Sequence, residues 1–181
     1  MCGISGIFSK DKKDLSRRII DGLKIINHRG PDETKYVVTN QFAAGTCRLS
    51  IEALKDGAQP VENSNFIAGF NGEIFNYKQL IDKFNLSKER CNSEIKTIIE
   101  LYSKLGKDFV KNLNGQFAIY IYDKRNNKIL LFRDHYGIRP LYYFKDQKNF
   151  AFSSEIKSIV SMLKSGFDLD LNSIYQTALF W

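Results

Sequence analysis

The first eight residues read Met1-Cys2-Gly3-Ile4-Ser5-Gly6-Ile7-Phe8, a run of small and apolar side chains. Such a run is typical of a buried strand, whereas chain termini are normally polar and loosely held. We therefore predict that the chain begins inside its own core and holds Cys2 in a fixed place. Removal of Met1 would leave a thiol and a free α-amine on Cys2. An α-amine titrates near ~7.7–8.0, so it can serve as a base beside its own thiol nucleophile.

The other expected strands are joined by short turns. Residues 117–122 and 128–133 flank the turn Asn126-Asn127, and residues 141–144 and 150–152 repeat this arrangement. Short connections imply hairpins and antiparallel pairing. Further strands are expected at residues 36–39, 42–47 and 65–70.

Apolar side chains recur at helical spacing in the remaining segments. Leu15, Ile19, Leu23 and Ile26 share one face, and helices are expected at residues 15–26, 77–84, 94–105 and 155–163. Helices that lie before and between antiparallel strands pack as layers on the sheets. The sequence therefore predicts an α+β sandwich.

Composition excludes several classes of protein. The chain has 181 residues, 43% of them hydrophobic and 26% charged, which suits a single globular domain. No apolar run is long enough to span a membrane, and residues 1–8 lack the basic segment of a secretory signal. The net charge of +7 is scattered, which predicts no nucleic-acid partner. Cys2, Cys47 and Cys91 form no CxxC pair, so we expect no metal site and a reducing cytoplasm.

Two further segments carry groups suited to chemistry. Arg48 follows an expected strand, and its planar guanidinium suits a carboxylate, although such a residue often forms a surface ion pair instead. Asn71-Gly72-Glu73 also follows an expected strand. The Asn amide and a Gly N–H are donors that can stabilise an oxyanion, whereas the alternative is an ordinary Asn-Gly turn.

Taken together, these motifs resemble those of class II glutamine amidotransferases, most of all the glutaminase half of asparagine synthetase and its relatives. The resemblance covers the whole chain. It is carried by residues 1–6, 28–32, 48–51, 57–60, 71–73, 114–118, 133–142 and 154–157. It implies an N-terminal-nucleophile hydrolase fold, with two antiparallel sheets between helical layers, and one glutaminase domain over residues 1–181.

The resemblance also implies a role for each motif. Cys2 would attack L-glutamine and form a γ-glutamyl thioester, and Asn71 and Gly72 would form the oxyanion hole. Arg48 would hold the substrate α-carboxylate, and Glu73 would help to hold the α-ammonium. The adjoining wall would consist of Leu49, Ser50 and Ile51.

One position departs from the family pattern. Relatives carry an acid before the periodic helix, where it pairs with the glutamine ammonium, and we align Asn92 with that acid. A hydrogen bond to a charged group contributes roughly 1.5–3 kcal/mol, against roughly 0.5–1.5 kcal/mol for a neutral one. We therefore expect glutamine to bind about tenfold more weakly than in relatives that keep the acid.

The end of the chain predicts a missing partner. Residues 174–181 form an apolar helical pattern that stops abruptly, so we expect the chain to be cut from something longer. The resemblance implies that the missing part is a C-terminal synthetase domain. By resemblance that domain would use ATP and magnesium, whereas this one needs no cofactor, and the full-length protein would be a candidate homodimer. Three interpretations stay open: an asparagine synthetase, a similar enzyme with another acceptor such as a sugar acid, or a weakly catalytic module that binds glutamine or a partner. Asn92 is the only residue that favours the third interpretation. Glu52-Ala53 departs from the apolar-then-acid pair common in asparagine synthetases, which leaves the acceptor open between the first two.

Overall fold

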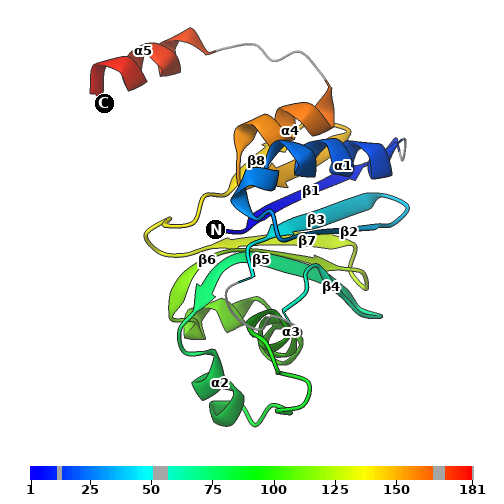
Figure 1. Ribbon diagram of the computed structural model, residues 1–181, viewed down its shortest axis with the longest axis vertical. Coiled ribbons are helices and arrows are strands. Elements are labelled where there is room, and N and C mark those ends of the chain that lie inside the picture. Colours follow the sequence, from blue (N-terminus) through cyan, green and yellow to red (C-terminus); the bar gives the residue numbers. More distant parts are fainter. Residues whose placement is uncertain (12–13, 51–56, 165–169, 181) are drawn as a thin grey trace.

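Two antiparallel sheets lie face to face in the computed structural model, which describes residues 1–11, 14–50, 57–164 and 170–180 (Figure 1). Within those residues, one sheet has five strands and the other has four. The five-stranded sheet is ordered β2 (Glu33–Val38), β3 (Phe42–Arg48), β1 (Gly3–Ser9), β9 (Asn149–Ser153) and β8 (Tyr142–Lys145). The four-stranded sheet is ordered β4 (Val61–Glu62), β5 (Phe66–Ile74), β6 (Gly115–Asp123) and β7 (Lys128–Arg133).

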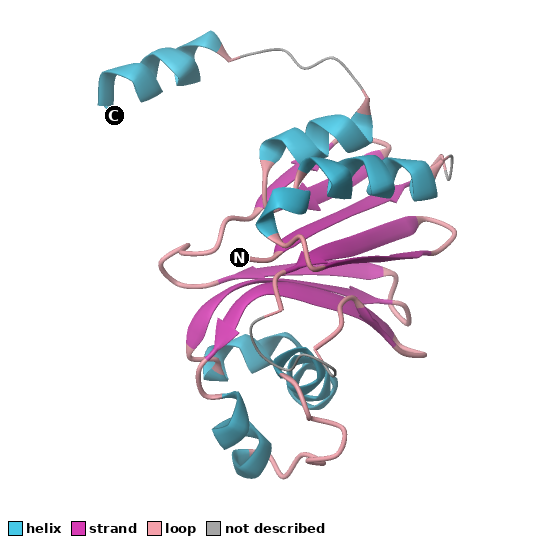
Figure 2. Cartoon of the chain, viewed as in Figure 1, coloured by secondary structure: helices cyan, strands magenta, loops and turns pink. Residues whose placement is uncertain are grey.

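Helices cover the outer face of each sheet (Figure 2). The five-stranded sheet carries α1 (Leu15–Ile25) and α4 (Ile156–Leu163), and the four-stranded sheet carries α2 (Tyr77–Lys83) and α3 (Glu94–Leu105). Two short 3₁₀ helices, η1 (Asn27–Arg29) and η2 (Gly106–Asn112), follow α1 and α3, and α5 (Leu171–Phe180) comes last in the chain. The predicted α+β sandwich is confirmed. None of the described helices is long and apolar enough to cross a membrane.

Three apolar layers hold the sandwich together. One lies between α1, α4 and the five-stranded sheet, one between the two sheets, and one between the four-stranded sheet and α3. Strand β1 serves two of them, because Ile4 packs between the sheets and Ile7 packs under the helices. Both side chains are fully buried. The chain therefore begins in the core, as its first eight residues predict.

The largest departure from the sequence-based expectation is the length of β5. This strand continues through Asn71 and Gly72 to Ile74, which pairs with Gly115 on β6. The Asn-Gly pair lies within the ladder instead of forming a turn, because the long β6 supplies partners as far as Gly115. Strand β2 also begins at Glu33, earlier than expected, and β4 was not expected at all.

Candidate active site

A cavity of about 200 Å³ opens at one end of the sandwich. It collects residues from the two positions before β1, the end of β3, the polar part of β5, the starts of α2 and α3, and the loop between β7 and β8. The residues that line it are Met1, Cys2, Arg48, Leu49, Gly57, Gln59, Phe70, Asn71, Gly72, Glu73, Tyr77, Ser93, Glu94, Ile95 and Arg139.

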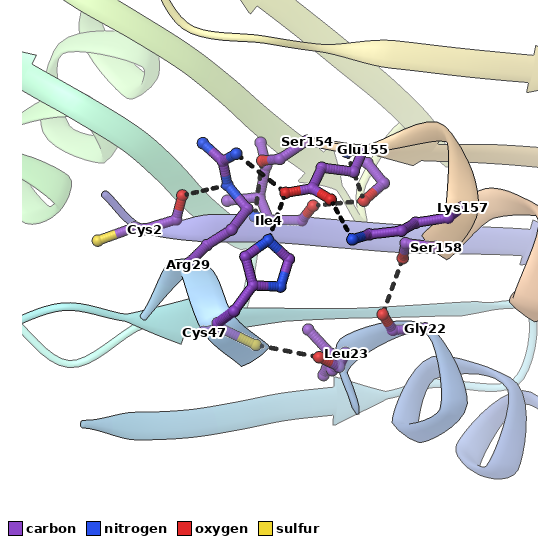
Figure 3. A network of polar contacts seen from close by, with 12 residues as sticks. Cys2, Ile4, Gly22, Leu23, Arg29, Cys47, Ser154, Glu155, Lys157 and Ser158 are labelled. Atoms are coloured by element: carbon purple, nitrogen blue, oxygen red, sulfur yellow. Dashed lines mark hydrogen bonds and ion pairs between the residues drawn. The ribbon is translucent and has the colours of Figure 1, made fainter. Parts of the chain in front are cut away.

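Cys2 enters this cavity at the head of the central strand β1. Its thiol is half-buried and lies 3.8 Å from the carbonyl oxygen of Leu49. Its own carbonyl accepts a hydrogen bond of 3.1 Å from Nε of Arg29 (Figure 3). Met1 lines the cavity in front of Cys2 and is 56% exposed. Loss of Met1 would therefore widen the cavity without disturbing the core.

The side-chain amide of Asn71 is the most unusual polar group in the cavity wall. Asn71 is 1% exposed, and neither its Nδ2 nor its Oδ1 has a hydrogen-bond partner among the described residues. A buried polar group without a partner costs roughly 1–3 kcal/mol, and most folded proteins avoid it. An amide left in this state beside a nucleophile is suited to donate to a group that arrives with a ligand.

Gly72 follows in a backbone conformation that only glycine adopts readily. Its φ is +148°, and a Cβ at this position would lie 2.0 Å from the carbonyl oxygen of Gln116. Strand β6 thus packs directly against the glycine. The close packing restricts the position of the neighbouring Asn71. Because Gly72 has no side chain, its backbone lines the cavity directly.

Charged groups of both signs line the same cavity. Arg48 ends β3, is 5% exposed, and has its Nη1 3.9 Å from Oε2 of Glu33. Glu73 is exposed on β5. Glu94 is the first residue of α3, and its Oε1 accepts a hydrogen bond of 2.6 Å from the backbone N–H of Ile74. Together with Arg139, two guanidinium groups and two carboxylates line a single small space.

Arg139 reaches the cavity from a loop that Asp134 organises. The buried carboxylate of Asp134 accepts hydrogen bonds from the backbone N–H groups of Phe117, Tyr136, Ile138 and Arg139. Burial opposes ionisation of Asp134, but these four bonds outweigh it and lower the pKa of its carboxyl. The loop is thereby held rigidly against β6.

Most of the residues singled out from the sequence meet at this cavity. Cys2, Arg48, Leu49, Asn71, Gly72 and Glu73 all line it. Ser50 lies beside it without lining it, and its backbone N–H donates to Oδ2 of Asp32 at 2.8 Å. Ile51 and the pair Glu52-Ala53 lie outside the described residues.

Asn92 does not join this group. Its side chain is exposed, and its Oδ1 accepts a hydrogen bond of 2.8 Å from Nζ of Lys96. The acid that does line the cavity at this point of the chain is Glu94, two residues later. The sequence analysis assigned the ammonium contact to Asn92 and did not name Glu94 as a site residue. The signal was present, since Glu94 opens the most regular helical pattern of the chain.

The other two cysteines differ from Cys2 in their surroundings. All three cysteines are unpaired, but Cys47 and Cys91 are buried, and burial raises the pKa of both thiols. Raised values keep a thiol protonated and unreactive at neutral pH. Among residues that the structure describes, no group of three or more His, Cys, Asp and Glu side chains is arranged to hold a metal ion.

Comparison with known proteins decides the family. A sequence profile described as a glutamine amidotransferase domain matches residues 1–180. The chain belongs to this family of enzyme domains. It is 37% identical to a putative glutamine-hydrolysing asparagine synthetase of Methanocaldococcus jannaschii, with 90% of this chain and 35% of the relative covered. The asparagine synthetase 2 of Bacillus subtilis is 36% identical, with 89% of this chain and 22% of the relative covered. Asparagine synthetase B of Escherichia coli is 31% identical, with 91% and 31% covered.

Two solved structures share the fold of this chain. Glutamine phosphoribosylpyrophosphate amidotransferase from B. subtilis has a TM-score of 0.71 at 20% identity, with 89% of this chain and 43% of that chain covered. An allosteric regulatory enzyme of purine biosynthesis has a TM-score of 0.74 at the same identity and coverage. The predicted N-terminal-nucleophile hydrolase sandwich is therefore confirmed, and the chain spans about a third or less of the asparagine synthetases named above.

Proposed function

We propose that this domain hydrolyses the side-chain amide of L-glutamine to glutamate and ammonia, with Cys2 as the nucleophile. The observation that carries the proposal is the gathering in one cavity of a thiol, an unpaired buried amide, two guanidinium groups and two carboxylates. Glutamine offers a matching group for each kind: an amide carbon for the thiol, an amide oxygen for the amide donor, an α-carboxylate for a guanidinium and an α-ammonium for the carboxylates.

The charges of the cavity fit the two ends of the substrate. The guanidinium of Arg48 would bind the α-carboxylate, since its planar fork of donors matches that group. Glu94 and Glu73 would bind the α-ammonium, and we assign this role to Glu94 instead of Asn92 because Glu94 lines the cavity and Asn92 does not. Leu49 would contact the substrate chain. Ser50 and Ile51 remain candidates for the adjoining wall.

The proposed reaction starts after removal of Met1. The α-amine of Cys2 takes the thiol proton, and the sulfur attacks the amide carbon of glutamine. Nδ2 of Asn71 and the backbone N–H of Gly72 would donate to the oxyanion, and donors of this kind typically contribute ~10²–10³ in rate. The amine then returns the proton to the leaving nitrogen, ammonia departs, and a thioester remains. Water attacks the thioester, releases glutamate and restores the thiol.

We further propose that the ammonia feeds a second domain. Curated relatives named as asparagine synthetases are about three times as long as this chain or longer, which supports a glutaminase domain over residues 1–181 followed by a synthetase domain. That domain would use ATP and magnesium and would amidate aspartate, or another acid such as a sugar acid. The three unpaired cysteines suit a cytoplasmic location, and a homodimer of the full-length protein remains a further expectation. The non-catalytic module loses its only support, because Asn92 lies outside the cavity.

Intact-mass spectrometry tests the reaction directly. The purified chain is measured before and after treatment with 6-diazo-5-oxo-norleucine, an electrophilic analogue of glutamine. We expect loss of Met1, one covalent adduct on Cys2, and release of glutamate and ammonia from glutamine by the untreated protein. Cys2→Ala should lose both the adduct and the hydrolysis. A processed Cys2 that takes no adduct and hydrolyses no glutamine would refute the proposal.

A further inference from the structure

Hydrogen bonds anchor both the start of β1 and the carbonyl group of Cys2. Ile4 is held by three hydrogen bonds to the end of β9 and the residue after it. Its N–H donates to Oγ of Ser154 at 3.0 Å, and its carbonyl accepts from the N–H of Ser154 at 2.9 Å and from Oγ of Ser153 at 3.0 Å. Cys2 itself lies before the first residue of β1. A side chain, Arg29, binds its carbonyl (Figure 3).

The guanidinium of Arg29 is in turn held by Glu155. Nη1 of Arg29 donates to Oε1 of Glu155 at 3.1 Å, and the two side chains are 10% and 21% exposed. Nε2 of His28 lies 2.9 Å from the same oxygen, and Nζ of Lys157 lies 3.0 Å from Oε2. Burial opposes ionisation of Glu155, but its contacts with Lys157, Arg29 and His28 outweigh it and lower the pKa of the carboxyl. The carboxylate is therefore charged at neutral pH.

We propose that Glu155 is a positioning residue for the nucleophile: it orients Arg29, and Arg29 holds the carbonyl of Cys2. The inference rests on the proposed function of Cys2. Once Met1 is removed, Cys2 is tied to the chain only through its carbonyl carbon, so a bond to that carbonyl decides where the thiol and the amine lie. The guanidinium is rigid and planar, so a carboxylate at Nη1 also fixes the direction of Nε.

The negative charge of Glu155, and not only its hydrogen bond, holds Arg29 in place. Arg29 is nine-tenths buried, and a buried guanidinium without its carboxylate is strongly disfavoured. Without that charge, Arg29 would turn toward water and release the carbonyl of Cys2. A displacement of the nucleophile by ~1 Å can cost ~10²-fold in rate. Glutamine binding would change little, because Glu155, Arg29 and their neighbours His28 and Lys157 are not among the residues assigned to bind the substrate.

The test uses Glu155→Gln in the 181-residue chain. We expect kcat for glutamine to fall by about tenfold, while KM stays within about twofold. Labelling of Cys2 by 6-diazo-5-oxo-norleucine should slow by about tenfold, because it needs an aligned thiol. The rate of alkylation of Cys2 by iodoacetamide should rise by about twofold, because this reaction needs only an accessible thiol and not an aligned one. The matched control is Lys157→Gln, which removes a partner of the other carboxylate oxygen and leaves the link to Arg29 in place; its kcat should stay within about twofold.

A double-mutant cycle separates positioning from general damage. If Glu155 acts through Arg29, then Glu155→Gln has no further effect on kcat in an Arg29→Gln background. Should Glu155→Gln fail to fold, Arg29→Lys tests the same link, because an ammonium group lacks the planar fork that bridges both partners, and it should show the same loss of kcat.

Three results would overturn the inference: an unchanged kcat in Glu155→Gln, an equal loss in Lys157→Gln, or an additive loss in the Arg29→Gln background. If the wild-type chain neither hydrolyses glutamine nor takes the analogue, the proposed function has failed. The alkylation rate then decides the inference alone. A rise in Glu155→Gln that disappears in the Arg29→Gln background supports it, and no rise refutes it.

Discussion

Asn71 and Asp123 are buried polar residues on paired strands, β5 and β6, and they lie toward opposite ends of that pair. Asp123 is fully bonded: its carboxylate accepts hydrogen bonds from Tyr102, Arg125 and Asn126. Asn71 has no hydrogen bond to either amide atom among the described residues. The Asp123 end stabilises the hairpin, whereas the Asn71 end leaves a donor ready for a ligand. One sheet thus separates a structural polar site from a candidate catalytic one.

The substitution Asn71→Ala gives the strongest test of the difference between these two residues. We expect kcat for glutamine to fall by ~10²–10³, because one oxyanion donor is removed. The free energy of unfolding should change by less than about 1 kcal/mol, because the substitution breaks no side-chain hydrogen bond and removes an unpaired buried amide. Glutaminase assays and urea denaturation measure the two quantities. A kcat within about threefold of the wild type would show that Asn71 is not such a donor.

Asp123→Asn should give the opposite result. The substitution removes the charge that Arg125, Asn126 and Tyr102 stabilise, so we expect a loss of about 2 kcal/mol in the free energy of unfolding. Glutaminase activity should stay within about twofold, because Asp123 does not line the cavity. A large loss of kcat in a folded Asp123→Asn protein would contradict the division between the two ends.

The same carboxylate predicts a dependence on pH. Burial opposes ionisation of Asp123, but hydrogen bonds from Arg125, Asn126 and Tyr102 outweigh it and lower its pKa to about 2. A folded-state pKa below the unfolded one means that the stabilisation is present above about pH 4 and is lost as the pH falls toward about 2. The difference in unfolding free energy between wild type and Asp123→Asn should therefore shrink between about pH 6 and about pH 2.5. An unchanged difference would show that the charge of Asp123 contributes nothing.

At the Asn71 end, Glu94→Gln sharpens the assignment of the substrate ammonium. We expect KM for glutamine to rise about tenfold and kcat to change little, because an ionic partner of the ground state is lost. Gln keeps an acceptor for the N–H of Ile74, so the start of α3 should stay in place. Steady-state kinetics measure both constants. A KM within about twofold of the wild type would point to Glu73 as the main partner of the ammonium.

Local patterns predicted most of this molecule. The buried run at residues 1–8 predicted the central strand. The position of Cys2 directly after Met1 predicted the candidate nucleophile. The helix at residues 94–105 was predicted with its observed bounds, since its apolar spacing is regular. The family motifs brought Arg48 and Asn71 into one site. These features depend on side chains that are near one another in sequence.

Features that depend on distant contacts were not predictable. The extension of β5 through Gly72 follows from its pairing with β6, which begins about forty residues later in the chain. Arg29 and Glu155 meet across 126 positions, and neither has a local pattern that reveals the contact. The position of Asn92 outside the cavity was not predictable for a different reason. The segment before α3 has no periodicity, so the sequence does not show which of its side chains faces the cavity.

Asn92→Asp should have the smallest effect of these substitutions, and it tests the proposed assignment of the ammonium to Glu94 instead of Asn92. The side chain is exposed and outside the cavity, and it already contacts Lys96 one helical turn later. An aspartate here would gain an exposed ion pair with Lys96, a gain of about 0.2–1 kcal/mol. KM for glutamine should change by less than about twofold, because a surface charge already paired and exposed to water acts weakly at a distance. Kinetics at two salt concentrations measure this effect. A tenfold fall in KM would instead return the ammonium to position 92, and Glu94 would then serve only to hold the N–H of Ile74 at the start of α3.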